Sequence, residues 1–158
     1  MDNPTYVLGH SALEIERLAR VQRLVDPITR EFFQAAGITP GMRVLDVGSG
    51  PGAVTFLAAE MVGSSGQVIG TDLAPEAIVA ARDTATQRAL RHVAFRQGNP
   101  AEMTFEQPFD AIVGRYVLWC QADLGAMLRG LAAHIRPGGV MVFHEPECRA
   151  VGTHDHDI

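Results

Sequence analysis

The chain has 158 residues, which fits one domain that buries its own hydrophobic core. Hydrophobic residues make up 47% of it and charged residues 20%, a balance typical of globular proteins. The formal net charge of −5 and the lack of a basic run argue against extended binding to nucleic acid.

The first ten residues are predicted to form a loop or arm, and they lack the basic start and apolar run of a signal peptide. From residue 11 onward, apolar residues recur three and four positions apart, as one face of a helix requires. Asp26 and Pro27 predict the end of one helix and the start of a second, which Gly37 terminates. Two short helices are therefore expected within residues 1–36. The residues of their predicted buried face are Leu18, Val21, Val25, Ile28 and Phe32.

Residues 43–47 are predicted to form the first strand, followed by a glycine-rich turn and a helix that runs to Val62. The glycines of the turn are Gly48, Gly50 and Gly52. A strand, a glycine turn and a helix N-terminus in this order are typical of nucleotide sites. The glycines alone do not identify the nucleotide, because Gly48, Gly50 and Ala53 also fit the dinucleotide pattern G-x-G-x-x-G/A.

Asp46, at the end of this strand, favours a ligand without phosphate. A carboxylate there would repel a pyrophosphate at short range but would attract an ammonium group. The run from Asp46 to Gly52, Asp-Val-Gly-Ser-Gly-Pro-Gly, resembles the D-x-G-x-G-x-G motif of class I S-adenosylmethionine-dependent methyltransferases. This resemblance implies that S-adenosyl-L-methionine is bound by Asp46, Gly48, Ser49, Gly50 and Gly52. The alternative is a tight turn in an ordinary α/β domain, with Asp46 as a cap.

Residues 67–71 are predicted to form the second strand, which ends at Asp72, twenty residues after Gly52. A carboxylate at the strand tip beside a glycine turn lies within reach of a ribose and can accept from both hydroxyls. The alternative is a helix cap, since Pro75 opens a helix predicted to run to Leu90. Asp72 and Leu73 also match the family's second motif, and both are predicted to contact the cofactor.

A third strand is predicted over residues 92–96, and the turn that follows resembles the family's adenine-binding turn. The family usually has an acidic residue after the glycine of this turn, and here that position is Asn99. Its side-chain oxygen accepts without a charge, so we expect a weaker contact. Pro100 has no N–H, which leaves Ala101 as the donor to the adenine ring. A plain loop is the alternative.

Residues 108–119 are predicted to form the fourth strand and its exit. In the family, the residues after this strand line the methionine end of the cofactor and the substrate entrance. The resemblance therefore implies cofactor contacts for Arg115 and Tyr116, for Arg115 through its backbone carbonyl, with a side chain that is merely structural. Trp119 is a candidate to line the pocket, whereas a lone tryptophan is more often part of the core.

Asp123 is predicted to cap the next helix, residues 136–139 to form a turn, and residues 140–143 to form a fifth strand. That strand is entirely apolar and is expected to be buried on both faces. The predicted buried helix face consists of Leu124, Met127, Leu128, Leu131 and Ile135. His144 and Glu145 follow the fifth strand and are candidates to orient a substrate or accept a proton, or are simply a histidine and a solvated glutamate. No catalytic residue is assigned.

Alternating strands and helices predict an α/β fold with a doubly wound, mostly parallel Rossmann-like sheet of five strands. The resemblance implies the strand order 3-2-1-4-5, with residues 37–147 as the cofactor-binding domain and residues 148–158 as a tail. In the family, N-terminal helices such as those expected in residues 1–36 form a lid. Small-molecule methyltransferases, including the ubiquinone and menaquinone biosynthesis type, are the nearest likeness.

The family's sheet normally has two further strands and a C-terminal region that closes the substrate site, so the chain is expected to lack this part. The apolar fifth strand would then be an edge, which predicts a homo-oligomer that covers it. Residues 154–157 alternate histidine and aspartate, but no third ligand is placed nearby and no metal is expected. Two cysteines, Cys120 and Cys148, and no membrane-spanning run favour a cytoplasmic protein.

The predicted function is transfer of a methyl group from S-adenosyl-L-methionine to a small-molecule acceptor, with S-adenosyl-L-homocysteine as the product. One alternative is a non-catalytic domain that binds the cofactor or a partner. A third possibility is a NAD(P)-dependent oxidoreductase, which Asp46 disfavours.

Overall fold

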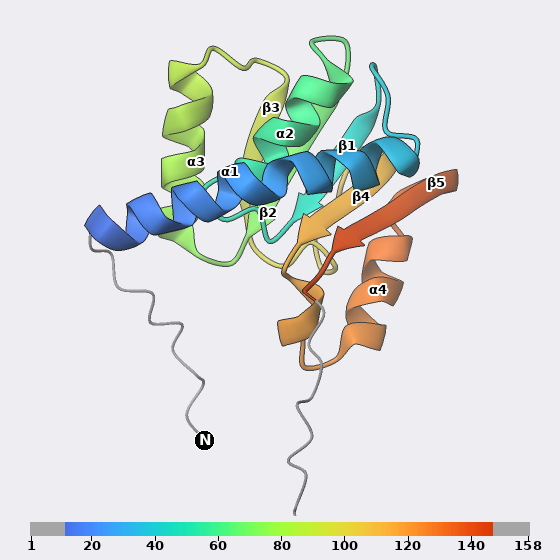
Figure 1. The fold of residues 1–158 in the computed structure, drawn as a ribbon. Helices are drawn as coiled ribbons and strands as arrows, with labels where there is room; N and C mark the ends of the chain where they lie inside the picture. Colours follow the sequence, from blue (N-terminus) through green and yellow to red (C-terminus); the bar gives the residue numbers. More distant parts are fainter. Residues whose placement is uncertain (1–11, 147–158) are drawn as a thin grey trace, which may run out of the picture.

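The computed structural model describes residues 12–146, except the side chains of residues 12–20 and 23. A single parallel sheet lies between helices on both of its faces (Figure 1). Its strands are β1 (Arg43–Val47), β2 (Gln67–Asp72), β3 (Val93–Gln97), β4 (Phe109–Arg115) and β5 (Ile135–His144). They are arranged in the order β3-β2-β1-β4-β5, which confirms the predicted topology.

Three helices cover one face of the sheet and one helix covers the other (Figure 1). The first three are α1 (Ala12–Ala35), α2 (Ala53–Val62) and α3 (Pro75–Gln87), and the fourth is α4 (Leu124–Ala132). A single turn of 3₁₀ helix, Leu118–Cys120, follows β4. Asp123 caps α4 as predicted, because its Oδ1 accepts a hydrogen bond from the Ala126 N–H at 2.8 Å. Within residues 12–146, no helix has the length and apolarity that crossing a membrane requires.

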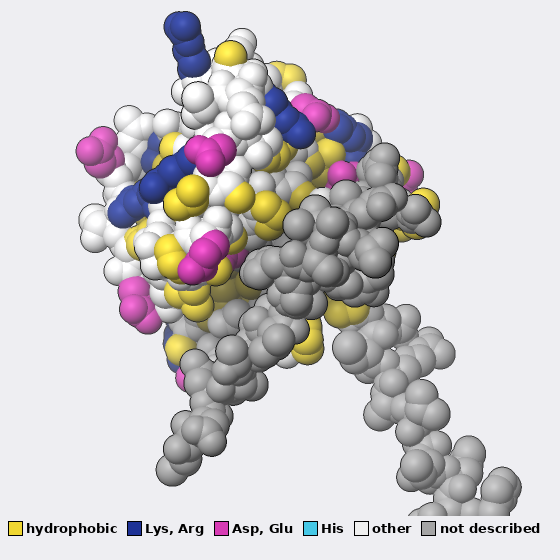
Figure 2. Space-filling view, turned by 90° about the vertical axis from the view of Figure 1, so that its left-hand side faces the viewer, with side chains coloured by type: hydrophobic (Ala, Val, Ile, Leu, Met, Phe, Trp, Pro, Cys, Tyr) yellow, Lys and Arg dark blue, Asp and Glu magenta, His cyan; other side chains and the backbone are white. Residues whose placement is uncertain are grey.

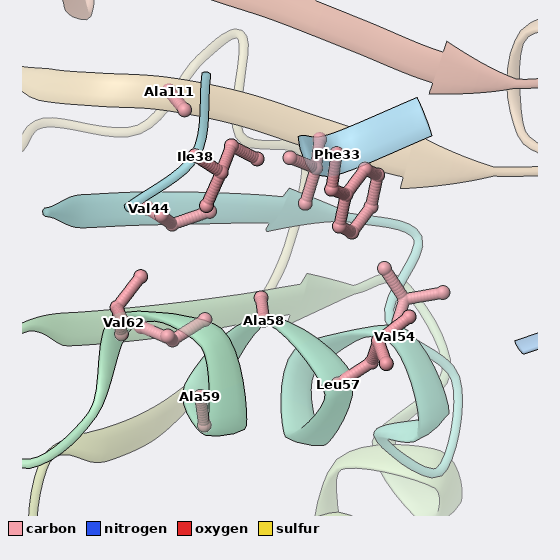
Figure 3. Close-up of a cluster of buried hydrophobic side chains, with 11 residues drawn as sticks. Phe33, Ile38, Val44, Val54, Leu57, Ala58, Ala59, Val62 and Ala111 are labelled. Atoms are coloured by element: carbon pink, nitrogen blue, oxygen red, sulfur yellow. The ribbon is translucent and has the colours of Figure 1, made fainter. Parts of the chain in front are cut away.

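The core has two sides because successive side chains of a strand point to opposite faces. Val44 of β1 packs with α1 and α2, as Figure 3 shows for Phe33, Leu57 and Ala58. Leu45, the next residue, packs with α4 on the other face. The central strands are therefore packed on both faces, which holds the loops at their carboxyl ends in place.

The two short helices predicted before β1 are one continuous helix, α1, with Pro27 inside it. Proline removes one backbone hydrogen bond and normally breaks a helix. Here Thr29 and Phe33 beyond it are completely buried, and their packing holds the second half of α1 against the sheet. Asp26 does not cap a helix; its carboxylate pairs with Arg115 of β4 at 2.7 Å. The arm before residue 12 lies outside the described residues.

The predicted buried face of α1 is wrong for three of its five residues; Val25 is half-buried, and the side chain of Leu18 lies outside the described residues. Val21, Ile28 and Phe32 are 43%, 46% and 45% exposed, whereas Thr29 and Phe33 are fully buried. The true buried face is rotated by one residue, about 100° around the helix axis. Apolar residues occur on both faces, so their spacing alone favoured the wrong one.

The fifth strand differs from its prediction in length and burial. The run predicted as a turn, residues 136–139, lies within β5, where Gly138 has a φ of +76° and the register with β4 shifts between Phe109 and Ala111. Ile135 therefore belongs to β5 and not to the face of α4. Met141 is 38% exposed, so the strand is not buried on both faces. In the part of the chain that the structure describes, β5 has no strand on its outer side, and the predicted homo-oligomer stays a prediction.

Candidate cofactor-binding site

The glycine turn joins β1 to α2 in a conformation that other residues rarely adopt. Gly48, Gly50 and Gly52 have φ values of +67°, +51° and +100°. A Cβ atom at Gly48 would lie 2.7 Å from Cγ2 of Val117, and one at Gly52 would lie 2.7 Å from the ring of Phe56. A Cβ at Gly50 would meet no atom within 4 Å. Two glycines therefore permit close packing, and the third faces open space.

Asp46 is a buried carboxylate with one oxygen left without a partner. Its side chain is 0% exposed, and Oδ2 accepts a hydrogen bond from Thr55 Oγ1 at 2.6 Å. Oδ1 has no hydrogen-bond partner among the described residues. Burial raises the pKa of Asp46 from 3.8 to about 7, although the Thr55 bond and nearby Arg115 oppose the shift. An interaction with the backbone N–H of Thr55, in the first turn of α2, also holds the pKa of Asp46 down, and it is the kind of contact that the cap alternative expected.

Asp72 connects the tip of β2 to the glycine turn. Its Oδ2 accepts from the Gly50 N–H at 2.7 Å, and its Oδ1 accepts from the Ala74 N–H at 2.9 Å. The second bond is of the kind that the helix-cap alternative expected, because Ala74 directly precedes α3. Each carboxylate oxygen can accept a further hydrogen bond, so the ribose role remains compatible with these contacts. The neighbouring Leu73 side chain is 71% exposed and presents an apolar surface beside the carboxylate.

The turn after β3 satisfies its own polar groups. Asn99 Oδ1 accepts from the Ala101 N–H at 3.1 Å, and Asn99 Nδ2 donates to Glu102 Oε1 at 2.8 Å. Such a side-chain bond two residues onward is common for asparagine in turns. Pro100 is buried, and the Gly98 N–H donates to the Asp72 carbonyl at 2.8 Å. The turn therefore adjoins Asp72, but the acceptor and donor predicted for adenine bind each other.

The exit of β4 is held by side chains that the sequence did not link to it. The Arg115 side chain is 6% exposed and pairs with Asp26, as the structural reading of this side chain expected. Tyr116 has a φ of +59°, an unusual value for tyrosine, and its N–H donates to the His144 carbonyl at 3.0 Å. Trp119 is 58% exposed, so it is not a core residue.

Glu145 fixes the loop that follows β4. Its Oε1 accepts from the N–H groups of Val117 and Leu118 at 3.0 and 3.1 Å, and Oε2 accepts from the Trp119 N–H at 3.3 Å. The carboxylate thus pairs with backbone N–H groups at the start of the 3₁₀ helix that have no partner within the helix. Glu145 is therefore a structural anchor for the wall of the site.

The predicted cofactor residues gather at the carboxyl ends of the strands. Asp72 binds Gly50, Val117 packs against Gly48, and the turn after β3 adjoins Asp72. Ser49 is 5% exposed, and its backbone N–H donates to the Thr71 carbonyl, which ties the glycine turn to β2. A separate groove of about 590 Å³ lies between α1 and α2, and its lining includes none of the predicted residues. Thr55 was missed by sequence reasoning, although its position in the first turn of α2 faces Asp46.

Comparison with known proteins assigns the family. A family model described as a methyltransferase domain matches residues 38–156, which is most of the chain. Aklanonic acid methyltransferase DauC of Streptomyces sp. (strain C5) is 38% identical over 126 residues, covering 78% of this chain and 57% of that protein. Ubiquinone/menaquinone biosynthesis C-methyltransferase UbiE of Cellvibrio japonicus is 32% identical over 118 residues, covering 72% of this chain and 47% of that protein.

A solved structure of a putative S-adenosyl-L-methionine-dependent methyltransferase from Methanococcus maripaludis has the same fold. Its TM-score is 0.74 at 19% identity, covering 92% of this chain and 67% of that chain. The chain spans about half the length of the curated relatives it matches. The family match, together with the strand order seen in the structure, shows that the chain belongs to the class I methyltransferase-domain family.

Proposed function

We propose that this protein binds S-adenosyl-L-methionine at the carboxyl ends of β1 and β2 and transfers its methyl group to a small-molecule acceptor. The observation that carries the proposal is the unpartnered Oδ1 of Asp46, a fully buried carboxylate oxygen beside the glycine turn. A buried charge needs a partner, and the ammonium group of the cofactor's methionine part has the matching charge. When bound, the cofactor supplies a methyl group on a positively charged sulfur.

The other side chains fit the remaining parts of the same molecule. Asp72 has lone pairs left for ribose hydroxyls, and exposed Leu73 offers an apolar surface to an adenine ring. We assign Asn99 and Ala101 a smaller contribution to cofactor binding, because a contact with adenine must share or replace the hydrogen bond between these two residues. Two carboxylates at one glycine turn disfavour a pyrophosphate, which argues against the NAD(P) alternative.

The names of the relatives support a small-molecule acceptor. DauC is named for aklanonic acid, and UbiE for the biosynthesis of ubiquinone and menaquinone. On the face that Figure 2 draws, Arg side chains are interspersed with Asp and Glu, and hydrophobic side chains gather between them. For an acceptor that is already nucleophilic, alignment with the methyl group provides most of the catalysis.

The proposal is tested by measuring S-adenosyl-L-homocysteine formed from S-adenosyl-L-methionine in the presence of pooled phenols, quinols, carboxylic acids and amines. We expect formation that depends on an acceptor and that falls at least tenfold in Asp72→Ala. Asp83→Ala, an exposed carboxylate on α3, is the matched control and should retain full activity. Cofactor binding without turnover for any acceptor would favour the alternative of a non-catalytic cofactor-binding domain.

A further inference from the structure

We propose that Nε2 of His144 is the general base for a phenolic acceptor and that Thr29 of α1 positions the ring. This inference rests on the proposed function and adds a catalytic residue and an acceptor class to it. His144 is the last residue of β5 and pairs in register with Arg115 of β4. Its Nδ1 lies 2.9 Å from Thr29 Oγ1, which is the one hydrogen bond of the ring within residues 12–146.

Thr29 decides which nitrogen of His144 carries the proton. Its hydroxyl is fully buried and has contacts with Val25 O at 3.2 Å, Arg115 Nη1 at 3.1 Å and His144 Nδ1. A hydroxyl has one proton to donate and two lone pairs to accept. All three contacts are hydrogen bonds at once only if Thr29 donates to Val25 and accepts from Arg115 and from Nδ1–H. Nε2 then keeps its lone pair.

The surroundings keep the imidazole neutral. Burial and the Arg115 guanidinium lower the pKa of His144 below its ordinary value, and Glu145 opposes them. The Glu145 carboxylate is bound to the backbone N–H groups after β4, and Asp26 is paired with Arg115. A neutral ring with a free lone pair is the form that accepts a proton.

His144 lies at the same edge of the sheet as the cofactor site. Arg115 acts electrostatically on both Asp46 and His144, so it lies near each of them. Aromatic rings flank the imidazole: Phe32 meets it edge-on at 4.9 Å, and Tyr116 is tilted toward it at 5.4 Å. Phe32 and Tyr116 are 45% and 40% exposed, which leaves aromatic surface for a planar ring to contact.

In the proposed step, the phenolic oxygen gives its proton to Nε2 of His144 and forms a bond to the methyl carbon. The carbon–sulfur bond breaks and its electron pair stays on sulfur, which becomes the neutral thioether of S-adenosyl-L-homocysteine. The imidazolium then releases the proton to solvent.

The tautomer is tested without any acceptor by nitrogen NMR of the histidine rings, with the His144 signals assigned from His144→Gln. We expect Nδ1 to be protonated and Nε2 to have the shift of a bare nitrogen at pH 7. Thr29→Val should change this pattern and Thr29→Ser should restore it. A proton on Nε2 in the native protein would overturn the proposal.

Catalysis is tested with two naphthols of similar size, one neutral at pH 8 and one made acidic by a nitro group and already ionised. His144→Gln should lower kcat about 100-fold for the neutral naphthol, within the range of general-base catalysis, and less than fivefold for the ionised one. Thr29→Val should lower kcat for the neutral naphthol about tenfold, with KM for the cofactor unchanged. His92→Gln, at the amino end of β3, is the matched control and should leave both rates unchanged.

The outcomes separate this inference from the proposed function. Equal losses for the two naphthols, or no loss in His144→Gln, would contradict the base role. Failure to methylate either naphthol, with S-adenosyl-L-homocysteine still bound, would overturn the inference and leave the cofactor proposal intact. Absence of cofactor binding would instead contradict the proposed function.

Discussion

Replacing Asp46 with asparagine is expected to stabilise the free protein at pH 8 while weakening its binding of S-adenosyl-L-homocysteine at least tenfold. An amide has nearly the same shape as the carboxylate, still accepts from Thr55 and has no charge to desolvate. It also cannot attract an ammonium group. A substitution that raises stability and removes binding marks a residue kept for function.

The pH dependence follows from the raised pKa of Asp46, from 3.8 to about 7. The folded protein binds this proton more tightly than the unfolded chain, so protonation of Asp46 stabilises the fold. This contribution to the free energy of unfolding is complete below pH 4 and is lost as the pH rises through 7. The full difference is on the order of 4 kcal/mol. A bound ammonium group would hold Asp46 ionised, so cofactor affinity should rise between pH 5 and pH 7 and level off above that range.

Denaturant unfolding at pH 5 and pH 8 measures the stability part of this prediction. Asp46→Asn should be at least ~1 kcal/mol more stable than the native protein at pH 8, a fraction of the desolvation cost, with a smaller difference at pH 5. Asp83→Asn, an exposed carboxylate, controls for the change of net charge. A variant that is less stable at pH 8, or that binds the ligand as tightly as the native protein, would refute this role for Asp46.

Replacing Phe33 with alanine should lower the free energy of unfolding by about 3–5 kcal/mol, the usual cost of emptying a buried phenylalanine site. Phe33 is 0% exposed and packs against β1 and α2 (Figure 3). Ile28→Ala removes an apolar side chain from the face of α1 that the spacing pattern favoured, and it should cost less than ~1 kcal/mol because Ile28 is 46% exposed. Urea unfolding of both variants compares the two faces directly. A larger loss of unfolding free energy in Ile28→Ala than in Phe33→Ala would show that the face of α1 with Ile28 is the buried one.

The strands and the glycine turn were predictable because their signals are local, whereas the strand order followed from the family resemblance. The run from Asp46 to Gly52 determines a strand, a turn and a helix start within a few residues. The rotation of α1 was not predictable, because it depends on which of two apolar faces the distant strands accept. Pro27 misled for the same reason: packing of residues beyond it outweighs one missing hydrogen bond.

The polar residues of the site also include some that the sequence predicts and some that it does not. The acidic residues at the ends of β1 and β2 follow from a motif, but their partners do not. Thr29 meets His144 from 115 positions away, and Arg115 meets Asp26 from 89 positions away. Such contacts exist only once α1 lies across the sheet. Asn99 differs from these, because its hydrogen bond with Ala101 is a local turn contact. It was not predicted, since the family resemblance led us to assign both residues to adenine.

Calorimetric titration with S-adenosyl-L-homocysteine tests the cofactor site most directly, with NADH as the comparison ligand and Asp72→Ala and Asp83→Ala as paired variants. The proposed site predicts micromolar binding of S-adenosyl-L-homocysteine, at least a tenfold loss in Asp72→Ala, no change in Asp83→Ala and no binding of NADH. The tenfold loss corresponds to about 1.4 kcal/mol, the lower end of what a charged hydrogen bond contributes. Binding of NADH in place of S-adenosyl-L-homocysteine, or affinity that Asp72→Ala leaves unchanged, would contradict it.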